Sequence, residues 1–469
     1  MKIAFIHYHL KTGGVTTVLK QQIKAIQNSC DTFVLTGSDQ ESSFPVDTVF
    51  IPGLGYDSFS KKKPPPHEVA ESIISAISAK FGSKCDVLHV HNPTLAKNTN
   101  FLNILSELQK RNINLFLQIH DFAEDGRPKV YFFDRYLSDC HYGVINSRDY
   151  DILLKAGLKK EGLHKIFNMV EPFTLKNTID YTDNIVLYPI RAIRRKNIGE
   201  AILLSLFFKN HERLSITLPP NSPADFYSYT GWKNFVINKN LNIEFESGLK
   251  NDFSKLVLSS RFLITTSISE GFGFSFIEPW CAKKVIWGRK LPDICSDFEN
   301  NGIDLGHLYS ELLVPVEWIG KDIFYQKWKD CILRNCKLLN YDIDKLSIDK
   351  TFSQVIKNNK IDFALFDESF QKNIISHVMS SKNDKNELIG LNPYLASVGI
   401  VPDKKRLIKN NMNAVFSNYN KDIYKEKLLE IYNKVSNNPV SHSIDKKILL
   451  SCFLDPRHFS LLKWCEYSE

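Results

Sequence analysis

Short apolar runs alternate with helical patterns along the first 310 residues of this chain, and this alternation constrains the fold more than any other feature. Helical spacing of apolar residues at 16–27 and 68–80 falls between runs that are too short for helices. Strands that alternate with helices predict a doubly wound parallel sheet with helices on both faces. The expected strands of this first part are 3–7, 32–35, 48–51, 87–90, 115–119, 142–145 and 165–167.

A second set of the same kind follows a polar stretch at 174–184. A chain of 469 residues is too long for a single hydrophobic core, so we expect two facing Rossmann-like α/β domains at 1–172 and 173–310. Residues 311–469 predict a helical C-terminal extension that packs on the rest, including on the first domain. The expected strands of the second set are 185–189, 214–218, 243–246, 262–265 and 284–287, and the expected helices of the extension include 324–339, 369–380 and 423–435.

Composition places the chain among ordinary globular proteins, with 43% hydrophobic and 24% charged residues. The sequence opens directly into a strand-like run, without a signal-peptide pattern, and holds no apolar stretch of about 18 residues, so we expect a cytoplasmic protein. Its nine cysteines are scattered without a Cys-x2-Cys pair, which favours buried reduced thiols over disulfides or a zinc site.

The basic residues of the chain are mostly dispersed, and its net charge of +8 is mild for this length. No basic stripe is interleaved with aromatic residues along one element, which argues against a nucleic-acid partner. The run Lys61-Lys62-Lys63 before three prolines predicts an exposed loop, with peripheral contact to an anionic membrane as a less favoured alternative.

The most informative single segment is Ser-Glu-Gly-Phe-Gly-Phe-Ser-Phe-Ile-Glu-Pro-Trp at 269–280, which follows the expected strand at 262–265. A strand, a glycine-containing loop and a helix N-terminus together direct unpaired N–H groups at one point, which suits a phosphate or diphosphate. Glu270 and Glu278 flank that point and can accept hydrogen bonds from sugar hydroxyls. The segment therefore predicts a site for a nucleotide joined to a sugar. The alternative is a plain helix start, in which Ser275 and Glu278 form a capping box.

Other polar residues and glycines also follow expected strands. Gly13 and Gly14 follow the strand at 3–7, His120 follows 115–119, and Arg191 follows 185–189. Ligands of open α/β folds bind at the carboxyl ends of the strands, so we expect these positions to lie beside a ligand.

Glu270 and Glu278, with Gly271, Phe272, Gly273 and Phe274 between them, resemble the signature of retaining glycosyltransferases of the GT-B fold, specifically the nucleotide-sugar-dependent family 4 (glycosyltransferase group 1). Further segments with the same resemblance occur in the expected order, with Ile190 and Met169 standing where the family has glycine. They are the glycine-rich loop at 11–15, the strand-end histidine motifs at 86–92 and 118–121, the turn at 167–172, and Arg191 with Lys196 as the Arg-x4-Lys of the donor site.

The resemblance implies how the donor diphosphate is held. Arg191 and Lys196 neutralise the charge that develops on the departing diphosphate, and Gly13 and Gly14 let the first loop approach it closely. The chain has no Asp-x-Asp motif, so the cationic side chains replace a divalent ion and neither a metal nor a cofactor is expected.

The resemblance also implies how the sugar and nucleoside are held. Glu278 accepts hydrogen bonds from the ribose, Glu270 from hydroxyls of the donor sugar, and His120 lies near that sugar. Backbone N–H groups of Gly271, Phe272, Gly273 and Phe274 contribute further. The implied reaction moves a hexose from a UDP-glucose or GDP-mannose type donor to an acceptor hydroxyl, with retention by front-face substitution.

The sequence also allows other functions and other roles for these residues. The same fold serves phosphorylases and nucleotide-sugar epimerases, and a degenerate transferase could act as an interaction protein. Arg191 and Lys196 could belong to a solvated basic cluster with Arg194 and Arg195, and His120 could be a core histidine. The role expected first for residues 311–469 is packing, and the next alternatives, in order, are oligomer contact and acceptor recognition. The donor base, the acceptor and the oligomeric state are not defined by the sequence.

Overall fold

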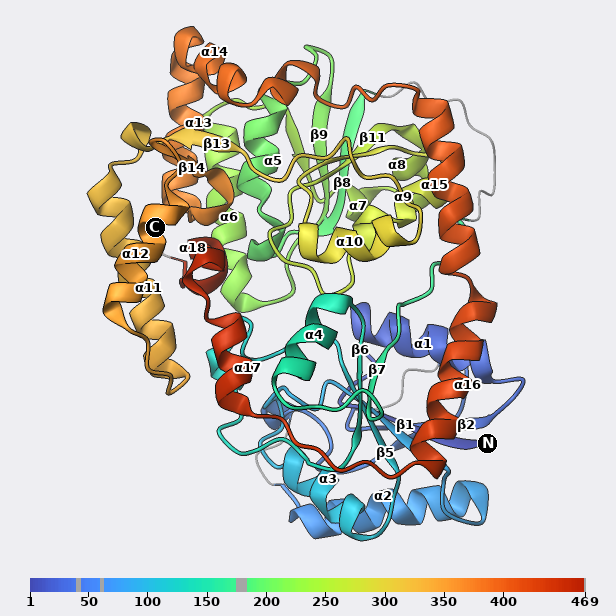
Figure 1. Ribbon diagram of the computed structural model, residues 1–469. Helices are drawn as coiled ribbons and strands as arrows, with labels where there is room; N and C mark the ends of the chain where they lie inside the picture. The colour runs from blue at the N-terminus through green and yellow to red at the C-terminus, as the bar shows by residue number, and fades with distance from the viewer. Residues whose placement is uncertain (39–43, 60–62, 174–183, 468–469) are drawn as a thin grey trace. The chain divides into compact units, whose positions relative to one another are not determined.

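The chain divides into two compact units in the computed structural model, which describes residues 1–38, 44–59, 63–173 and 184–467 (Figure 1). Unit 1 comprises Met1–Glu171 and Tyr419–Phe453, and unit 2 comprises Pro172–Asn418 and Leu454–Glu469. The residues after 310 are therefore shared between both units. Most of the polar stretch at 174–184, and Lys61 and Lys62 of the lysine run, lie outside the described residues.

Unit 1 is built on a seven-stranded sheet. Its strands are β1 (Lys2–His7), β2 (Asp31–Thr36), β3 (Thr48–Phe50), β4 (Val87–His91), β5 (Leu115–Ile119), β6 (His141–Val144) and β7 (Leu163–Lys165). All pairs are parallel, in the order β3-β2-β1-β4-β5-β6-β7. The order reverses between β1 and β4, where Ile3 lies opposite Thr32 on one side and Val87 on the other. This is a doubly wound sheet with a topological switch point.

Both faces of the unit 1 sheet are buried because successive side chains of β1 point to opposite sides. Ile3 and Phe5 pack with helices α1 (Gly14–Ile26) and α16 (Lys421–Asn437). Ala4 and Ile6 belong to the opposite core, with helices α2 (Pro66–Phe81), α3 (Phe101–Lys110), α4 (Ser147–Lys155) and α17 (Lys446–Phe453). Two helices from the end of the sequence thus complete unit 1.

Unit 2 repeats this plan with five parallel strands. They are β8 (Ile185–Arg191), β9 (Arg213–Leu218), β10 (Ile243–Phe245), β11 (Ser260–Thr265) and β12 (Ile286–Gly288). The order is β10-β9-β8-β11-β12, with Leu187 opposite Ser215 on one side and Leu263 on the other. The switch point lies between β8 and β11. The prediction of two Rossmann-like doubly wound sheets is confirmed.

Helices account for most of the remainder of unit 2, together with a short antiparallel pair, β13 (Leu313–Pro315) and β14 (Lys360–Asp362). Trp280 and Trp328 are fully buried among them. The helices are α5 (Ile198–Ser205), α6 (Pro223–Asn238), α7 (Ser247–Lys250), α8 (Phe253–Ser259), α9 (Glu278–Cys281), α10 (Pro292–Asn300), α11 (Lys321–Leu338), α12 (Lys345–Val355), α13 (Glu368–Ser380), α14 (Lys382–Leu391), α15 (Lys404–Asn418) and α18 (Leu461–Trp464).

A buried ion network connects the second sheet to its helices. Arg289, which follows β12 and is 3% exposed, lies between two carboxylates. Its Nη2 donates to Glu200 Oε2 on α5 at 2.8 Å and to Asp362 Oδ1 on β14 at 2.7 Å. Tyr309 donates to Glu200 Oε1 at 2.7 Å, and Asn197 Nδ2 donates to Glu200 Oε2 at 2.8 Å. Such dense pairing offsets the cost of burying these charges.

Three further properties concern the described residues as a whole. No helix in this part of the chain is both long and apolar enough to cross a membrane. All nine cysteines are described and unbridged, and seven of them are buried. Within the described ranges, no group of three or more His, Cys, Asp or Glu side chains is arranged to hold a metal ion.

Candidate donor and acceptor site

Hydrogen bonds at the switch point of unit 2 connect the segment after β8 to the end of β11. The backbone N–H of Thr266 donates to Tyr188 Oη at 3.1 Å, and Tyr188 Oη donates to the carbonyl of Lys196 at 2.6 Å. Thr266 Oγ1 donates to the carbonyls of Lys196 at 3.1 Å and Asn197 at 2.9 Å. All these groups come from residues next to the two central strands. They fix Lys196 beside the loop that carries Glu270.

Glu270 is 8% exposed and lies between two cations. Lys196 Nζ donates to Glu270 Oε1, and Arg195 Nη1 lies 3.6 Å from Glu270 Oε2. Burial favours the protonated carboxyl, but the charges of Lys196 and Arg195 outweigh burial and lower the pKa of Glu270. Burial lowers the pKa of Lys196, and the Glu270 carboxylate counteracts this effect. Glu270 is therefore an ionised, acceptor-only group at neutral pH.

The other two arginines of this segment have different surroundings. Arg191, at the end of β8, is half-buried and donates from Nη1 to the carbonyl of Pro219 at 3.0 Å. Ile190 stands where the family has glycine, and the pairing of β8 with β9 is irregular between Tyr188 and Arg191. Arg194 contacts both carboxylate oxygens of Glu368, from Nε at 2.6 Å and from Nη2 at 2.8 Å. Arg194 therefore anchors the segment to α13 and does not belong to a solvated cluster.

The Gly-Phe-Gly-Phe segment is held by its aromatic rings. Phe272 is 5% exposed, with its ring centroid 5.0 Å from Phe274 and 5.5 Å from Phe298. Gly273 has φ +90°, and a Cβ there would lie 2.9 Å from the ring of Phe276. Only glycine satisfies both conditions at 273. Gly271 precedes this turn and lies directly after Glu270.

The expected helix start after this turn differs from the prediction. Residues Phe274–Phe276 form a 3-10 turn, and α9 has only four residues, so it supplies little helix dipole. The N-cap is Ile277, without a side-chain cap, and Ser275 Oγ is buried without a hydrogen-bond partner among the described residues. The capping-box alternative is therefore wrong. The helix ends early because Lys283 adopts a left-handed conformation, after which the N–H of Lys284 donates back to the carbonyl of Pro279 at 2.9 Å.

Glu278 begins α9 with a solvent-exposed side chain. The surrounding protein nevertheless disfavours its charge and raises the pKa of Glu278 to about 7. Since the side chain reaches solvent, it is open to a ligand hydroxyl, and it accepts hydrogen bonds best at a pH above 7.

In unit 1, Gly13 and Gly14 lie where the sequence predicts, between β1 and α1. Gly13 has φ 179°, an extended conformation open to any residue, and Gly14 begins the helix. A Cβ at Gly14 would meet nothing within 4 Å, and one at Gly13 would meet only the carbonyl of Lys11 at 3.8 Å. Neither backbone geometry nor packing requires glycine at these two positions. The space that their missing side chains leave lies at the N-terminus of a 13-residue helix.

His120 follows β5 and is 6% exposed. Its Nε2 lies 2.9 Å from His91 Nδ1, and its backbone N–H donates to Asn92 Oδ1 at 2.7 Å. Burial lowers the pKa of His120 to about 4, so the ring is neutral at pH 7. His89 is fully buried between Gln118 Oε1 and Tyr432 Oη, each at 2.9 Å, so both of its ring nitrogens have partners within the protein.

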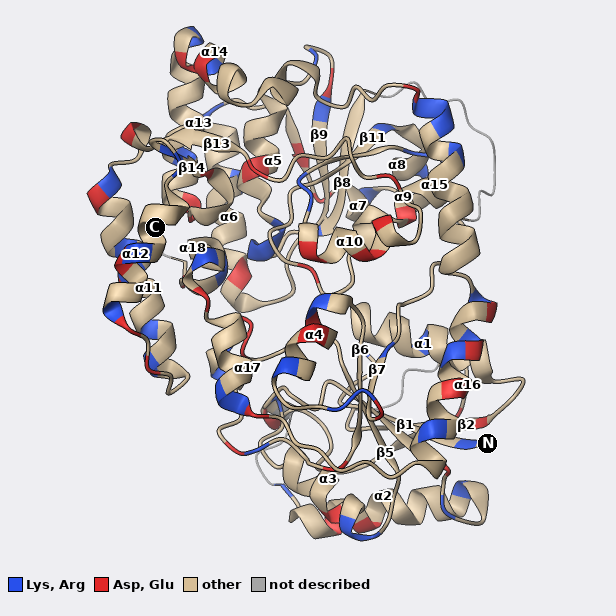
Figure 2. Ribbon diagram, viewed as in Figure 1, with Lys and Arg blue, Asp and Glu red and all other residues tan. Residues whose placement is uncertain are grey.

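Sequence reasoning missed three residues beside these groups. His7 ends β1 with its ring centroid 6.1 Å from that of His91, and its position at a strand end was the available signal. Arg195 contacts Ser269 and Glu270 but lies outside the Arg-x4-Lys motif. Lys463 donates from Nζ to Ser269 Oγ at 3.3 Å, and Figure 2 shows its basic segment on α18. No local pattern connects two residues that are 194 positions apart.

Two doubly wound units, with polar groups and glycines at the carboxyl ends of their central strands, define the GT-B fold. The chain is a glycosyltransferase of this fold. It is similar to mannosylglucosyl-3-phosphoglycerate synthase of Petrotoga mobilis, with 27% identity over 430 residues that cover 81% of this chain and 82% of that protein. No known protein-family model matches the chain.

Solved structures show the same fold at low sequence identity. A glycosyltransferase from Rickettsia africae superposes with a TM-score of 0.54 at 13% identity, covering 93% of this chain and 99% of that one. Anabaena HepE, solved in complex with UDP-glucose, has a TM-score of 0.54 at 12% identity, covering 92% and 98%. Sucrose-phosphate synthase from Thermosynechococcus elongatus has a TM-score of 0.53 at 14% identity, also covering 92% and 98%.

Proposed function

We propose that this glycosyltransferase moves a mannosyl group from a GDP-mannose type donor to a hydroxyl of an acidic glucosyl acceptor, with retention of the anomeric configuration. The pairing of Lys196 and Arg195 with Glu270 at the switch point of unit 2 carries this proposal. The choice of mannose and of a phosphoglycerate-bearing acceptor is supported by the similarity to mannosylglucosyl-3-phosphoglycerate synthase. UDP-glucose is the alternative donor.

The donor diphosphate is assigned to Arg191 and Lys196, at the ends of the segment that follows β8. A lysine gives a point charge and an arginine gives a planar fork, and both stabilise the charge that builds up as the sugar departs. The family resemblance adds Gly13 and Gly14, where the missing side chains leave open space at the start of α1. With these cations in place we propose that transfer requires no divalent metal, so addition of a chelator should leave the rate unchanged.

The hydroxyl groups of the donor are assigned to carboxylates. Glu270 is ionised and can accept two hydrogen bonds from the mannosyl group, and Glu278 accepts from the ribose. His120, neutral at pH 7, contributes a hydrogen bond to the sugar rather than a charge. The N–H groups of 271–274 lie on a loop that the aromatic contacts hold rigid.

The family resemblance implies retention, and the surroundings of Glu270 favour one route to it. A carboxylate that faces both Lys196 and Arg195 is a weak nucleophile, so a covalent glycosyl-enzyme at this residue is disfavoured. The other route to a retained product is front-face substitution. The acceptor oxygen bonds to the anomeric carbon as the bond to the diphosphate breaks, and a phosphate oxygen takes the acceptor proton.

The test begins with calorimetric titration of the purified protein with GDP, UDP and ADP. GDP should bind most tightly, and Glu278→Ala should weaken its binding about tenfold, or about 1.4 kcal/mol. Glu387→Ala, a change of an exposed glutamate on α14, is the matched control and should have no effect. Transfer to glucosyl-3-phosphoglycerate is then followed by NMR, which reads the anomeric configuration of the product. An inverted product would refute retention, and binding of none of the nucleotides would refute the donor site.

A further inference from the structure

The segment of unit 2 that begins at Leu454 places Lys463 against the loop that carries Glu270, and hydrogen bonds fix the backbone of this segment. Trp328 Nε1 donates to the carbonyl of Phe459 at 3.0 Å, and Asn335 Nδ2 donates to the carbonyl of Trp464 at 3.0 Å. Arg194 Nη1 donates to the carbonyl of Cys465. Two buried residues of α11 and the half-buried Arg194 thus fix both sides of Lys463. Its position is a built feature of the fold and not that of a loose terminus.

Lys463 and Arg195 converge on one residue. Lys463 Nζ donates to Ser269 Oγ at 3.3 Å, while Arg195 Nη1 donates to the carbonyl of Ser269 at 3.0 Å. Ser269 is buried and directly precedes Glu270, whereas both cationic side chains are half-buried and reach solvent. Two positive groups from segments far apart in the sequence therefore lie together beside the proposed donor-sugar carboxylate.

Glu270 lies beside the same serine and faces Lys196 and Arg195. Glu368 pairs with Arg194 at 2.6 Å, and Asp367 pairs with Lys327 at 2.5 Å. Two cationic groups from separate segments that meet at one buried serine suit a ligand group with two negative charges.

We propose that Lys463 and Arg195 form a subsite for the phosphate of the acceptor. This inference rests on the proposed function, which assigns the donor diphosphate to Arg191 and Lys196 and not to these two cations. A planar guanidinium beside an ammonium group matches a phosphate monoester in geometry and charge. The subsite would select a phosphorylated acceptor over the same acceptor without its phosphate.

The experiment compares two acceptors, glucosyl-3-phosphoglycerate and glucosylglycerate, at saturating donor. Lys463→Gln and Arg195→Gln should each raise the KM for the phosphorylated acceptor by at least about tenfold. For Lys463→Gln, the KM for glucosylglycerate and the KM for the donor should stay within about twofold. Lys463→Arg should restore most of the preference for the phosphorylated acceptor, because it keeps the charge.

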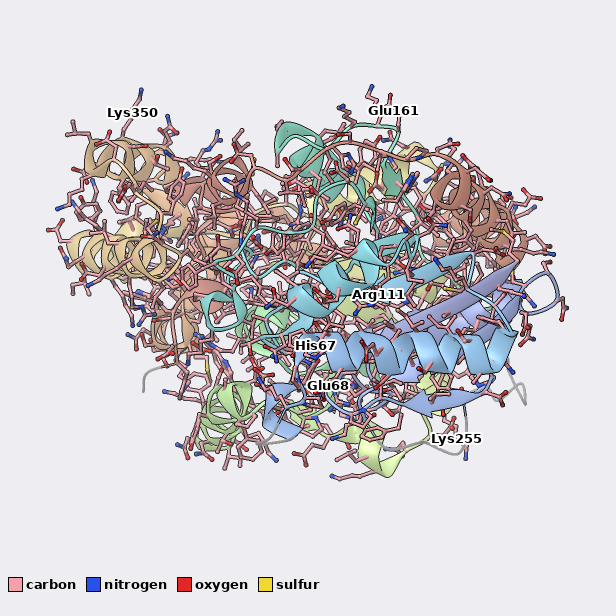
Figure 3. The ribbon with its side chains drawn as sticks, turned by 90° about the horizontal axis from the view of Figure 1, so that it is seen from below. His67, Glu68, Arg111, Glu161, Lys255 and Lys350 are labelled. Carbon is pink, nitrogen blue, oxygen red and sulfur yellow. The ribbon has the colours of Figure 1, made fainter. Side chains whose placement is uncertain are left out.

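Lys350→Gln is the matched control, since Lys350 projects from α12 into solvent at a distant position (Figure 3). It should change no parameter. An equal loss with both acceptors, or a raised donor KM alone, would overturn the subsite while leaving the transferase intact. Transfer by the unaltered protein to neither acceptor would instead refute the proposed function. If Lys463→Gln fails to fold, the dependence of KM on ionic strength is measured with the unaltered protein. The KM for the phosphorylated acceptor should rise more steeply with ionic strength than the KM for glucosylglycerate, which carries only a carboxylate. An equal rise for both would overturn the subsite.

Discussion

The two units share a strand order but differ in the polar groups at the ends of their central strands. Unit 1 places buried neutral histidines there, with burial lowering the pKa of His7 to about 3 and of His120 to about 4. Unit 2 places ion pairs there, Lys196 with Glu270 and Arg194 with Glu368. One topology therefore supports two chemistries, and the strand-end side chains decide which of them a unit provides.

This contrast can be measured because all six tryptophans lie in unit 2, at 232, 280, 287, 318, 328 and 464. Tryptophan fluorescence follows the unfolding of unit 2, and hydrogen exchange on peptides of 1–171 follows unit 1. These two probes distinguish the unfolding of unit 1 from that of unit 2.

The largest effect should come from Arg289→Met. Loss of the guanidinium leaves the buried carboxylate of Glu200 and the half-buried carboxylate of Asp362 without their cation, and removal of one partner of a buried pair costs about 3–5 kcal/mol. Denaturant unfolding followed by tryptophan fluorescence should show this loss. Arg406→Met, in an exposed pair with Asp403, should cost less than about 1 kcal/mol. Equal effects of the two changes would show that the buried network does not support unit 2.

Lys196→Ala should be next in size and should act on catalysis. Removal of a preorganised charge that stabilises a leaving group lowers kcat by about 100- to 1,000-fold. Steady-state kinetics with saturating acceptor measures the change. Lys239→Ala, an exposed lysine after α6, serves as control. A fall in kcat of less than about threefold would contradict the assignment of Lys196 to the diphosphate.

Acid should weaken unit 1 before unit 2. The buried histidines have folded pKa values below the ordinary 6.5, so the unfolded state binds more protons and stability falls as the pH drops below 6.5. In unit 2 the pKa of Glu270 lies below 4.5. The stability that its ion pair contributes is therefore lost only as the pH falls below that value. Among the described histidines of unit 2, His307 has a lowered pKa, and it makes a smaller contribution to the pH dependence of stability.

As the pH falls from 6.5 to 4.5 we therefore expect hydrogen exchange in residues 1–171 to become faster. Tryptophan fluorescence, which reports on unit 2, should stay unchanged over this range. His89→Gln should reduce this pH dependence in unit 1. His67→Gln should not, because His67 is exposed at the start of α2 (Figure 3). Unfolding of both units together over this range would show that histidine burial does not distinguish them.

The smallest effects should come from glycine changes, and only the change in unit 2 should lower stability. Gly273→Ala introduces a side chain at φ +90° and against Phe276, so it should destabilise unit 2 by more than about 1 kcal/mol. Gly14→Ala meets no atom within 4 Å and should leave the stability of unit 1 unchanged, while it raises the KM for the donor. Thermal unfolding and donor kinetics on both variants test this pair. A stable Gly273→Ala variant, or an unstable Gly14→Ala variant, would contradict it.

Much of the fold could be predicted because its signals are local. The apolar run at 115–119 is buried on both faces as β5, and the expected helix at 369–380 is α13 (Glu368–Ser380). Packing of part of 311–469 on the first domain could be predicted, but its bounds at Tyr419 and Phe453 could not, since they depend on tertiary packing. The short length of α9 was also missed, because a left-handed Lys283 decides it.

The candidate site shows the same limit. Glu270 and Lys196 belong to local motifs, and the structure brings their side chains together. Lys463 has no neighbouring pattern, and its position depends on carbonyl contacts with Trp328 and Asn335. Long-range backbone contacts of this kind leave no periodic signal in a single sequence.

The division of both units along the chain has a consequence for protein synthesis. Translation delivers the two sheets before Tyr419–Phe453 of unit 1, and the segment of unit 2 from Leu454 follows. Until that segment leaves the ribosome, Trp328 and Asn335 lack the carbonyls that they bind in the folded chain. A chain that stalls at about residue 450 would carry Glu270, Lys196 and Arg195 but not Lys463. Translation of the segment from Leu454 would thus convert a donor-binding intermediate into an enzyme with the proposed acceptor subsite.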